Sequence, residues 1–271
     1  MANKFSGKVA VISGSSRGIG KAIAIELAKN GASIVVNGRN KEQLNIAKKE
    51  IEVYTKNVIS VCCDVSIIAE GKYLISAALD AFGCLDILIN NAGISMRGGM
   101  NDLNPEVFPV VFRTNVFGAV NLTIPAIPEI RKTQGSIIFV SSVAGIRGLP
   151  FLSAYCSSKM ALKAIAESIR IEEYDNNIHV GLIYVGKTEI DSNKEIISHD
   201  GSKKVLMERT KENVLSKEYV AKAILKNIRN RKFTTTLSTI GKLNKLLQPH
   251  MPMIIEKIIS RNLIKFEKGN Q

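Results

Sequence analysis

Several residue types that mark particular protein classes are scarce in this sequence. Tryptophan is absent from its 271 residues, and there are only three histidines and four cysteines. The histidines are scattered, and the cysteines have neither metal-ligand nor redox spacing, which argues against a metal enzyme. We expect all four cysteines to be reduced and buried in a cytosolic protein. These cysteines are Cys62, Cys63, Cys84 and Cys156.

Long hydrophobic runs are also missing. No run approaches the roughly 18 consecutive apolar residues of a membrane-spanning helix, so we expect none. The N-terminus offers no apolar segment with a cleavage site before a strand-like run begins at Val9, so we expect no export. Apolar residues nevertheless make up 45% of the chain, which is enough for the core of one large domain.

Acidic residues are few in the C-terminal part. Residues 217–271 contain 12 Lys and Arg against 3 Glu and no Asp, a net charge of +9. Because the whole chain carries +13, the rest contributes only +4. The basic character therefore belongs to the C-terminal part and not to the body.

Apolar runs alternate with amphipathic stretches along the chain. The runs contain few polar residues, which favours a parallel sheet covered on both faces. We predict an α/β fold with a doubly wound parallel sheet (Rossmann type) in a single domain, residues 1–237, followed by a helical extension, residues 238–271. The predicted strands are residues 8–13, 33–36, 58–63, 85–89, 136–140, 179–184 and 233–237. The predicted helices are residues 23–29, 41–54, 69–82, 105–131, 154–174 and 216–229.

A glycine-rich segment follows the first predicted strand and reads Ser-Gly-Ser-Ser-Arg-Gly-Ile-Gly over residues 13–20. Glycines allow the backbone to turn tightly and approach a pyrophosphate, which the N-terminus of the next helix attracts. This context predicts a dinucleotide-binding loop; the alternative is an ordinary strand–helix turn. The residues expected at the cofactor are Gly14, Ser16, Arg17, Gly18, Ile19 and Gly20.

No acidic residue ends the second predicted strand, where NAD-binding sites of this fold commonly hold the ribose. Arg39 is found there instead, and Arg17 lies in the neighbouring loop. Both guanidinium groups suit a 2′-phosphate, although they could also be solvated surface arginines. We therefore expect NADP(H) to be favoured over NAD(H).

Four polar residues form the predicted catalytic group: Asn115, Ser142, Tyr155 and Lys159. Tyr155 and Lys159 are four apart on a predicted helix and share a face, so the ammonium can lower the pKa of the phenol. Ser142 ends a strand thirteen residues before Tyr155, at the sheet edge that also holds the glycine loop. It can orient a substrate oxygen, or it can simply cap the strand end. Asn115 can equally be a helix-bending polar residue.

Over about residues 5–235, these motifs resemble the short-chain dehydrogenase/reductase (SDR) family. Its fingerprint is Thr-Gly-x-x-x-Gly-Ile-Gly, here with Ser13 for Thr, and it also has the Asn-Asn-Ala-Gly of residues 90–93 and the Tyr-x-x-x-Lys. The resemblance implies an NAD(P)-dependent oxidoreductase acting on CH–OH or C=O groups, with Asn115 holding a water in a proton relay to Lys159. It also implies that Lys159 and Tyr155 contact the cofactor. The further cofactor residues that it implies are Asp64, Val65, Asn91, Ala92 and Gly93.

The segment after the sixth predicted strand departs from the family pattern. The family usually has Pro-Gly there, followed four residues later by a Thr at the nicotinamide carboxamide. Residues 184–188 read Tyr-Val-Gly-Lys-Thr, without the proline and with Thr188 two residues after the glycine. By resemblance, we expect Thr188 to reach the carboxamide.

Three segments at the site edge are rich in apolar residues: residues 94–100, 143–151 and 189–207. They predict an apolar substrate pocket under a mobile lid of about residues 187–213. Alternatively, half of these side chains pack the lid onto the body. The side chains are those of Ile94, Met96, Ile146, Leu149, Phe151, Ile190, Ile196 and Ile197.

The extension at residues 240–266 is basic and amphipathic, and Pro249 and Pro252 should divide it into two helices. It could lie on an anionic membrane surface, or cover the pocket or a subunit interface. By resemblance, such tails occur in SDR members that act on steroids, retinoids or sphingoid bases, which favours a lipid-like substrate. The protein would then be cytoplasmic, with a peripheral membrane contact.

The reading that best fits these features is an NADPH-dependent carbonyl reductase or alcohol dehydrogenase with Tyr155 as acid and base. The alternative is an NADP-binding sensor or scaffold without turnover. We expect no nucleic-acid partner, because the basic residues lie among aliphatic side chains without stacking aromatics. By resemblance, the helices at residues 105–131 and 154–174 would form a homodimer or homotetramer.

Overall fold

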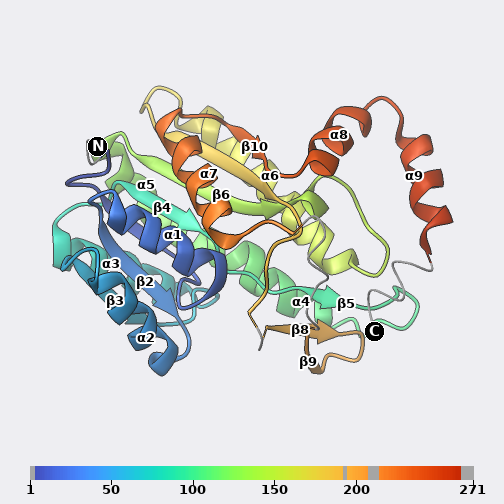
Figure 1. The fold of residues 1–271 in the computed structure, drawn as a ribbon, viewed down its shortest axis with the longest axis horizontal. Helices are drawn as coiled ribbons and strands as arrows, with labels where there is room; N and C mark the ends of the chain where they lie inside the picture. The colour runs from blue at the N-terminus through green and yellow to red at the C-terminus, as the bar shows by residue number, and fades with distance from the viewer. Residues whose placement is uncertain (1–3, 192–193, 207–213, 264–271) are drawn as a thin grey trace.

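The computed structural model describes residues 4–191, 194–206 and 214–263 (Figure 1). The predicted lid, about residues 187–213, lies partly outside these residues. The last part of the predicted amphipathic segment, residues 264–266, lies entirely outside them.

The centre of the molecule is a seven-stranded parallel sheet with the order β10-β7-β6-β4-β1-β2-β3. All seven predicted strands are confirmed, with ends that differ by up to two residues. Six of them form because short runs rich in Val and Ile are covered on both faces of the sheet, and β10 consists of three β-branched threonines. The strands are β1 (Val9–Ile12), β2 (Ser33–Gly38), β3 (Val58–Cys62), β4 (Ile87–Asn90), β6 (Ser136–Ser142), β7 (His179–Val185) and β10 (Thr234–Thr236).

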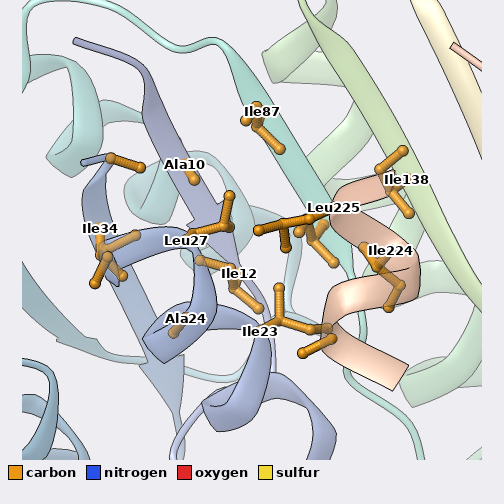
Figure 2. Close-up of a cluster of buried hydrophobic side chains, with 14 of the residues drawn as sticks. Ala10, Ile12, Ile23, Ala24, Leu27, Ile34, Ile87, Ile138, Ile224 and Leu225 are labelled. Atoms are coloured by element: carbon orange, nitrogen blue, oxygen red, sulfur yellow. The ribbon is translucent and has the colours of Figure 1, made fainter. Parts of the chain in front are cut away.

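Helices cover both faces of this sheet, so the doubly wound fold is confirmed. One face carries α1 (Gly18–Lys29), α2 (Lys41–Glu52) and α7 (Lys217–Arg229), and the other carries α3 (Ile68–Phe82), α5 (Gly118–Thr133) and α6 (Ser153–Glu172). Figure 2 shows the first face, where Ile23 and Leu27 of α1 lie between β1 and α7. Each fully buried side chain of this size contributes roughly 1.5–3 kcal/mol to folding.

The strand order places the candidate site. The chain runs outward from β1 to β2 and β3, then crosses back to β4 on the other side of β1. Ligands of such sheets bind beyond the carboxyl ends of the strands at this reversal. The glycine loop after β1, the Asn-Asn-Ala-Gly segment after β4 and Ser142 at the end of β6 all lie at this edge.

The helix predicted at residues 105–131 has a different internal structure. It consists of α4 (Val107–Phe112), a π-helical turn η1 (Arg113–Phe117) and α5, and Pro105 precedes it instead of lying in its first turn. By length and composition this stretch could cross a membrane, as no other helix among the described residues could. Leu122, Ala126 and Ile130 are nevertheless buried in the core against the sheet, so it is a core helix.

The segment predicted to be a mobile lid contains strands. A second sheet is formed by β5 (Met96–Arg97), β8 (Glu195–Ser198) and β9 (Lys203–Val205), in the order β5-β8-β9. Met96 pairs with Ile197, and both side chains are buried in a cluster with the start of α6. The alternative in which these side chains pack the lid onto the body therefore holds for Met96 and Ile197. Such short strands, paired across about 100 residues by sequence numbering, leave no periodic signal.

The extension forms the two predicted helices, α8 (Thr239–Leu247) and α9 (Pro252–Arg261), with Pro252 as the first residue of the second. Pro is tolerated there because the first N–H groups of a helix have no partner within the helix. Both helices lie beyond β10, at one end of the molecule (Figure 1). α8 buries only Gly241 and α9 buries no residue.

The expectation that all four cysteines are buried is wrong for two of them. Cys62 is exposed at the end of β3, and Cys84 is partly exposed, whereas Cys63 and Cys156 are buried. β3 is the outermost strand of the sheet, so its side chains have fewer neighbours than those of a central strand.

Candidate active site

The glycine loop has the close approaches that its sequence predicts. Gly14 has a φ of +60°, and a Cβ there would lie 2.9 Å from the Cα of Ala92. The residue before α1, Arg17, donates no side-chain cap, and no acidic residue lies in the first turn of the helix. The N–H groups of α1 are therefore available to an anion. The carboxylate of Asp191 lies beside Gly18 and pairs with Lys217.

Ser13 holds the two segments of the loop together. Its hydroxyl accepts the N–H groups of Asn91 and Ala92, both at 3.0 Å. The side-chain amide of Asn91 in turn donates to the carbonyl groups of Ser13, at 2.9 Å, and Gly14, at 3.0 Å. A serine in place of the usual threonine thus keeps the hydrogen bonds that fix the loop against β4.

Two residues that the sequence analysis did not identify support the same loop. The buried amide of Asn37 accepts the N–H of Gly14 at 3.3 Å and donates to the carbonyl of Cys63 at 3.1 Å. The hydroxyl of Ser15 accepts the N–H of Asn37 at 2.9 Å. The loop is therefore tied to both β2 and the segment after β3.

Of the two basic residues predicted for the 2′-phosphate, Arg39 lies directly after β2 and Arg17 directly before α1. Arg39 is largely exposed, and its guanidinium is 3.6 Å from the carboxylate of Asp64. Burial by itself raises the pKa of Asp64, but hydrogen bonds from Ser66 and the charge of Arg39 lower it below its usual value. A Cβ at Gly38 would lie 3.0 Å from the Ser16 hydroxyl, so Ser16 borders the same place.

Other predicted cofactor residues take supporting positions. Val65 is buried, and its carbonyl accepts the side-chain amide of Asn121 at 3.0 Å. Ile19 packs against the core below the loop. A Cβ at Gly93 would lie 3.1 Å from the Asn115 amide oxygen and 3.3 Å from the Lys159 ammonium, so Gly93 lies next to the predicted catalytic group.

Lys159 is the buried cation of the site. Its ammonium donates to the carbonyl of Val140 at 3.0 Å and lies 6.0 Å from the centre of the Tyr155 ring. Burial, and secondly the charge of Lys194, lowers the pKa of Lys159 to about 8. The hydroxyl of Ser141 donates to the carbonyl of Lys159 at 3.0 Å and fixes this turn of α6 on β6.

Ser142 ends β6 as predicted. Its hydroxyl oxygen accepts the N–H of Ala144 at 3.2 Å, so it does cap the turn that follows the strand. Because the oxygen serves as the acceptor in this bond, the hydroxyl proton can still be donated to another group. Tyr155 lies in the first turn of α6 and packs with Leu149 and Leu152 from the intervening loop.

Asn115 lies inside the π-helical turn. Its amide oxygen accepts the N–H of Ile94 at 2.7 Å, and its amide nitrogen donates to the carbonyl of Ile94 at 3.0 Å and to the Ser158 hydroxyl at 2.9 Å. The π turn aims this side chain at the segment after β4, in keeping with the frequent occurrence of such turns at functional sites. The side chain thus links three elements around Lys159.

Thr188 is buried in the rebuilt segment after β7. Its hydroxyl donates to the carbonyl of Gly186 at 3.1 Å, and its backbone pairs with Leu215. The segment is held to the start of α7 by hydrogen bonds between Leu215 and both Lys187 and Glu189. It crosses the carboxyl edge of the sheet on the side of the glycine loop, where Asp191 meets Gly18.

The edge fits a nicotinamide dinucleotide, the cofactor that this fold and these motifs imply. A glycine backbone with no room for a Cβ leads into uncapped N–H groups, which suits a pyrophosphate. Tyr155 and Lys159 lie at the same edge, on the other side of β4.

Comparisons with known proteins agree with the geometry. A protein-family model described as short chain dehydrogenase matches residues 8–201. The dehydrogenase/reductase SDR family member 7B of Bos taurus is 35% identical over 237 residues, 85% of this chain and 73% of the relative. The 3-ketodihydrosphingosine reductase of Bos taurus is 34% identical over 238 residues, 85% of this chain and 71% of the relative.

Solved structures show the same fold. A short-chain dehydrogenase/reductase from Burkholderia phymatum in complex with NAD has a TM-score of 0.76 at 24% identity, covering 86% of this chain and 89% of its own. An alcohol dehydrogenase from Thermococcus sibiricus complexed with 5-hydroxy-NADP has a TM-score of 0.75 at 23% identity, and the match covers 86% of this chain and 97% of that protein. The chain therefore belongs to the short-chain dehydrogenase/reductase family and is an oxidoreductase that acts on CH–OH or C=O groups.

Proposed function

We propose that the protein is an NADPH-dependent reductase of an apolar, lipid-like ketone, or a dehydrogenase of the corresponding alcohol. The observation that carries this proposal is the position of the buried Lys159 ammonium, 6.0 Å from the Tyr155 ring at the carboxyl edge of the sheet. A positive charge there stabilises the phenolate of Tyr155 and makes the phenol a better proton donor near neutral pH.

Each residue of the group has a distinct task. Bound NADPH supplies the hydride. Tyr155 donates the proton to the carbonyl oxygen, and Ser142 orients that oxygen with the hydroxyl proton that its turn-capping bond leaves available. Lys159 tunes Tyr155 and binds the cofactor ribose, while Asn115 positions the segment after β4 beside Lys159 and supports a water-mediated proton relay.

The preference for NADPH rests on Arg39. No acid lies at the end of β2, and the exposed guanidinium of Arg39 can exchange its 3.6 Å contact with Asp64 for a 2′-phosphate. Ser16 borders the same place. We assign Arg17, which directly precedes α1, to the phosphate as well, and Thr188 to the carboxamide. The related structures were solved with NAD or with an NADP analogue, so they favour neither cofactor.

The lipid-like substrate rests on the apolar side chains around Tyr155 and on the relatives. Ile94, Phe108 and Tyr155 pack against one buried apolar cluster, and Leu149 and Tyr155 pack against a second. Relatives include a 3-ketodihydrosphingosine reductase and an 11-beta-hydroxysteroid dehydrogenase-like protein of Arabidopsis thaliana, 38% identical over 189 residues, 69% of this chain and 62% of the relative.

We also propose that the protein works in the cytoplasm at an anionic membrane surface, to which α8 and α9 attach it. Large apolar side chains on both helices are exposed, and basic side chains flank them, which suits a helix lying in the interface. The four free cysteines are consistent with a reducing compartment. The apolar residues are Ile240, Leu243, Leu246, Met253, Ile254 and Ile258.

A homodimer or homotetramer through the α4–α5 stretch and α6 is part of the same proposal. Phe117 and Ile124 on the first, and Met160 and Ile171 on the second, are large apolar side chains exposed on the surface. Exposed apolar side chains on two neighbouring long helices suit a subunit interface.

The replacement Tyr155→Phe tests the catalytic role. Because the ring stays and only the proton donor is lost, we expect kcat for ketone reduction to fall by about 10²–10⁴-fold while NADPH still binds. Stopped-flow oxidation of NADPH and titration of its fluorescence measure the two quantities. Full turnover by this variant would overturn the mechanism.

A further inference from the structure

Arg147 is a buried cation beside the catalytic group. Only 9% of the residue is exposed, and it lies in the loop between Ser142 and Tyr155. Its Nε donates to the Gly148 carbonyl at a long 3.4 Å, and its Nη1 is buried without a hydrogen-bond partner among the described residues. A buried guanidinium with an unpaired nitrogen is costly, because it has given up its water.

The counter-ion of Arg147 is weak. The carboxylate of Glu256 in α9 lies 3.4 Å from Nη2, and its side chain is 64% exposed to water. An exposed carboxylate at this distance stabilises the guanidinium little, because water screens the charge and the side chain loses conformational entropy when it is held in place. An anion therefore has room beside Arg147, but the Glu256 carboxylate compensates the buried positive charge only weakly.

The wall opposite this loop is α8. Gly241 packs so closely that a Cβ there would lie 2.6 Å from Val143, the residue that follows Ser142. Asn244 and Gln248, three and seven residues further on, share the face of α8 on which Gly241 lies. Both side-chain amide oxygens are buried and have no hydrogen-bond partner among the described residues. The side of α8 that meets the start of the loop thus carries two polar side chains, each with one buried and unsatisfied oxygen.

The loop that carries Arg147 also forms the apolar surroundings of the reacting centre. Leu149 and Leu152 from this loop pack with Tyr155 and Cys156 of α6. A substrate whose carbonyl meets Ser142 and Tyr155 would therefore pass along the loop with its remaining chain. Its far end would arrive between the loop and α8.

We propose that Arg147 binds an anionic group, a carboxylate or a phosphate, at the far end of the substrate. The substrate anion takes the place of Glu256. This inference rests on the proposed function and narrows its substrate class to apolar ketones or alcohols with an anionic end.

The test compares two substrates that differ only in charge: a long-chain methyl ketone and the same ketone with a carboxylate at its far end. For the intact protein without lipid, kcat/KM should be higher for the carboxylate. Arg147→Met should lower the ratio of kcat/KM for the carboxylate to kcat/KM for the methyl ketone. The expected decrease is about ten- to a hundredfold, the value of a charge-assisted hydrogen bond. Arg229→Met, a cation exposed at the end of α7, is the matched control and should leave the ratio as it is.

Glu256→Gln provides a second, independent variant, because it removes the competing carboxylate from an exposed position. It should raise the ratio, which a purely structural role of Arg147 would not do. An unchanged ratio in both variants overturns the inference. Should Arg147→Met not fold, the result with Glu256→Gln decides.

Calorimetry separates this inference from the proposed function. If the protein reduces neither ketone, the proposed function fails, yet binding of the oxo-carboxylate that is lost in Arg147→Met still supports the inference. Vesicles of phosphatidylglycerol identify the other source of an anion. If Arg147→Met weakens vesicle binding but leaves the substrate ratio unchanged, the anion is a lipid headgroup and the assignment to substrate is wrong.

Discussion

Two buried titratable residues lie at opposite ends of the parallel strands, one at the carboxyl ends and one at the amino ends. Burial lowers the pKa of both, to about 8 for Lys159 and to about 4 for His179. Lys159 lies at the carboxyl edge beside Tyr155, whereas His179 begins β7 at the other edge. We propose a catalytic role for Lys159 alone, and His179 is part of the framework.

His179 should make the fold sensitive to acid. Its ring nitrogens lie 3.1 Å from the Ser136 hydroxyl and 3.1 Å from the Lys232 carbonyl. Its pKa is 6.5 when unfolded and about 4 when folded, so the unfolded chain binds more protons between these values. Stability is therefore fully present above the unfolded pKa and is lost as the pH falls toward 4, by about 3 kcal/mol.

Urea unfolding followed by circular dichroism at several pH values measures this loss. His179→Gln keeps a polar side chain but cannot take up the proton, so its stability should vary less with pH over the same window. If both proteins lose stability equally between pH 6.5 and about 4, other groups cause the acid sensitivity.

Arg39 should determine the choice of cofactor. Arg39→Gln removes the guanidinium that we assign to the 2′-phosphate, so KM for NADPH should rise about ten- to a hundredfold. KM for NADH should change little, because that cofactor has no phosphate at this position. Steady-state kinetics with both cofactors measures the effect, and an equal rise for the two would show that Arg39 only supports the loop through Asp64.

The residues of the site differ in how far the sequence reveals them. The spacing of Ser142, Tyr155 and Lys159 is a local signal, and the structure brings Tyr155 and Lys159 together as that spacing predicts. Asn37 gave no such signal, because its importance comes from hydrogen bonds to Gly14 and Cys63, which are distant in sequence. Arg147 was missed as well, since an arginine in a loop usually lies in water.

Among the elements, those with strong periodicity were predicted and those held by distant pairing were not. Six of the seven strands of the main sheet are mainly apolar runs that can be recognised locally, and β10 is three threonines between Phe233 and Leu237. In contrast, β5 has two residues and forms only because β8 pairs with it. The π turn at Asn115 adds a residue to one helical turn without disturbing the apolar pattern around it. Both unpredicted features lie next to the catalytic group.

The helices α8 and α9 should bind anionic membranes. Ile254→Ser with Ile258→Ser removes two exposed apolar side chains of α9, so binding to vesicles containing phosphatidylserine should weaken at least about tenfold. Ile46→Ser with Ile68→Ser, equally exposed on α2 and α3, is the control and should not change binding. Flotation of the full chain with vesicles measures this, and equal binding of all three proteins would exclude α9 as the anchor.

In the whole molecule, the parallel sheet brings the proposed cofactor-binding loop and the proposed catalytic residues to one edge. The glycine loop after β1 and the Tyr155–Lys159 pair at the start of α6 lie on either side of β4, and each is fixed by hydrogen bonds to neighbouring strands. The basic helices α8 and α9 lie at the end of the molecule where Arg147 meets Glu256. This arrangement suits an enzyme that takes its substrate from a lipid surface.

Oxidation of NADPH and of NADH should therefore be measured against carbonyl compounds that range from small ketones to long-chain and steroid ketones. The proposed function predicts turnover with NADPH, weaker turnover with NADH, and a kcat/KM that rises with the apolar length of the ketone. Tight binding of NADPH without turnover of any compound would contradict it and would identify the protein as a cofactor-binding sensor.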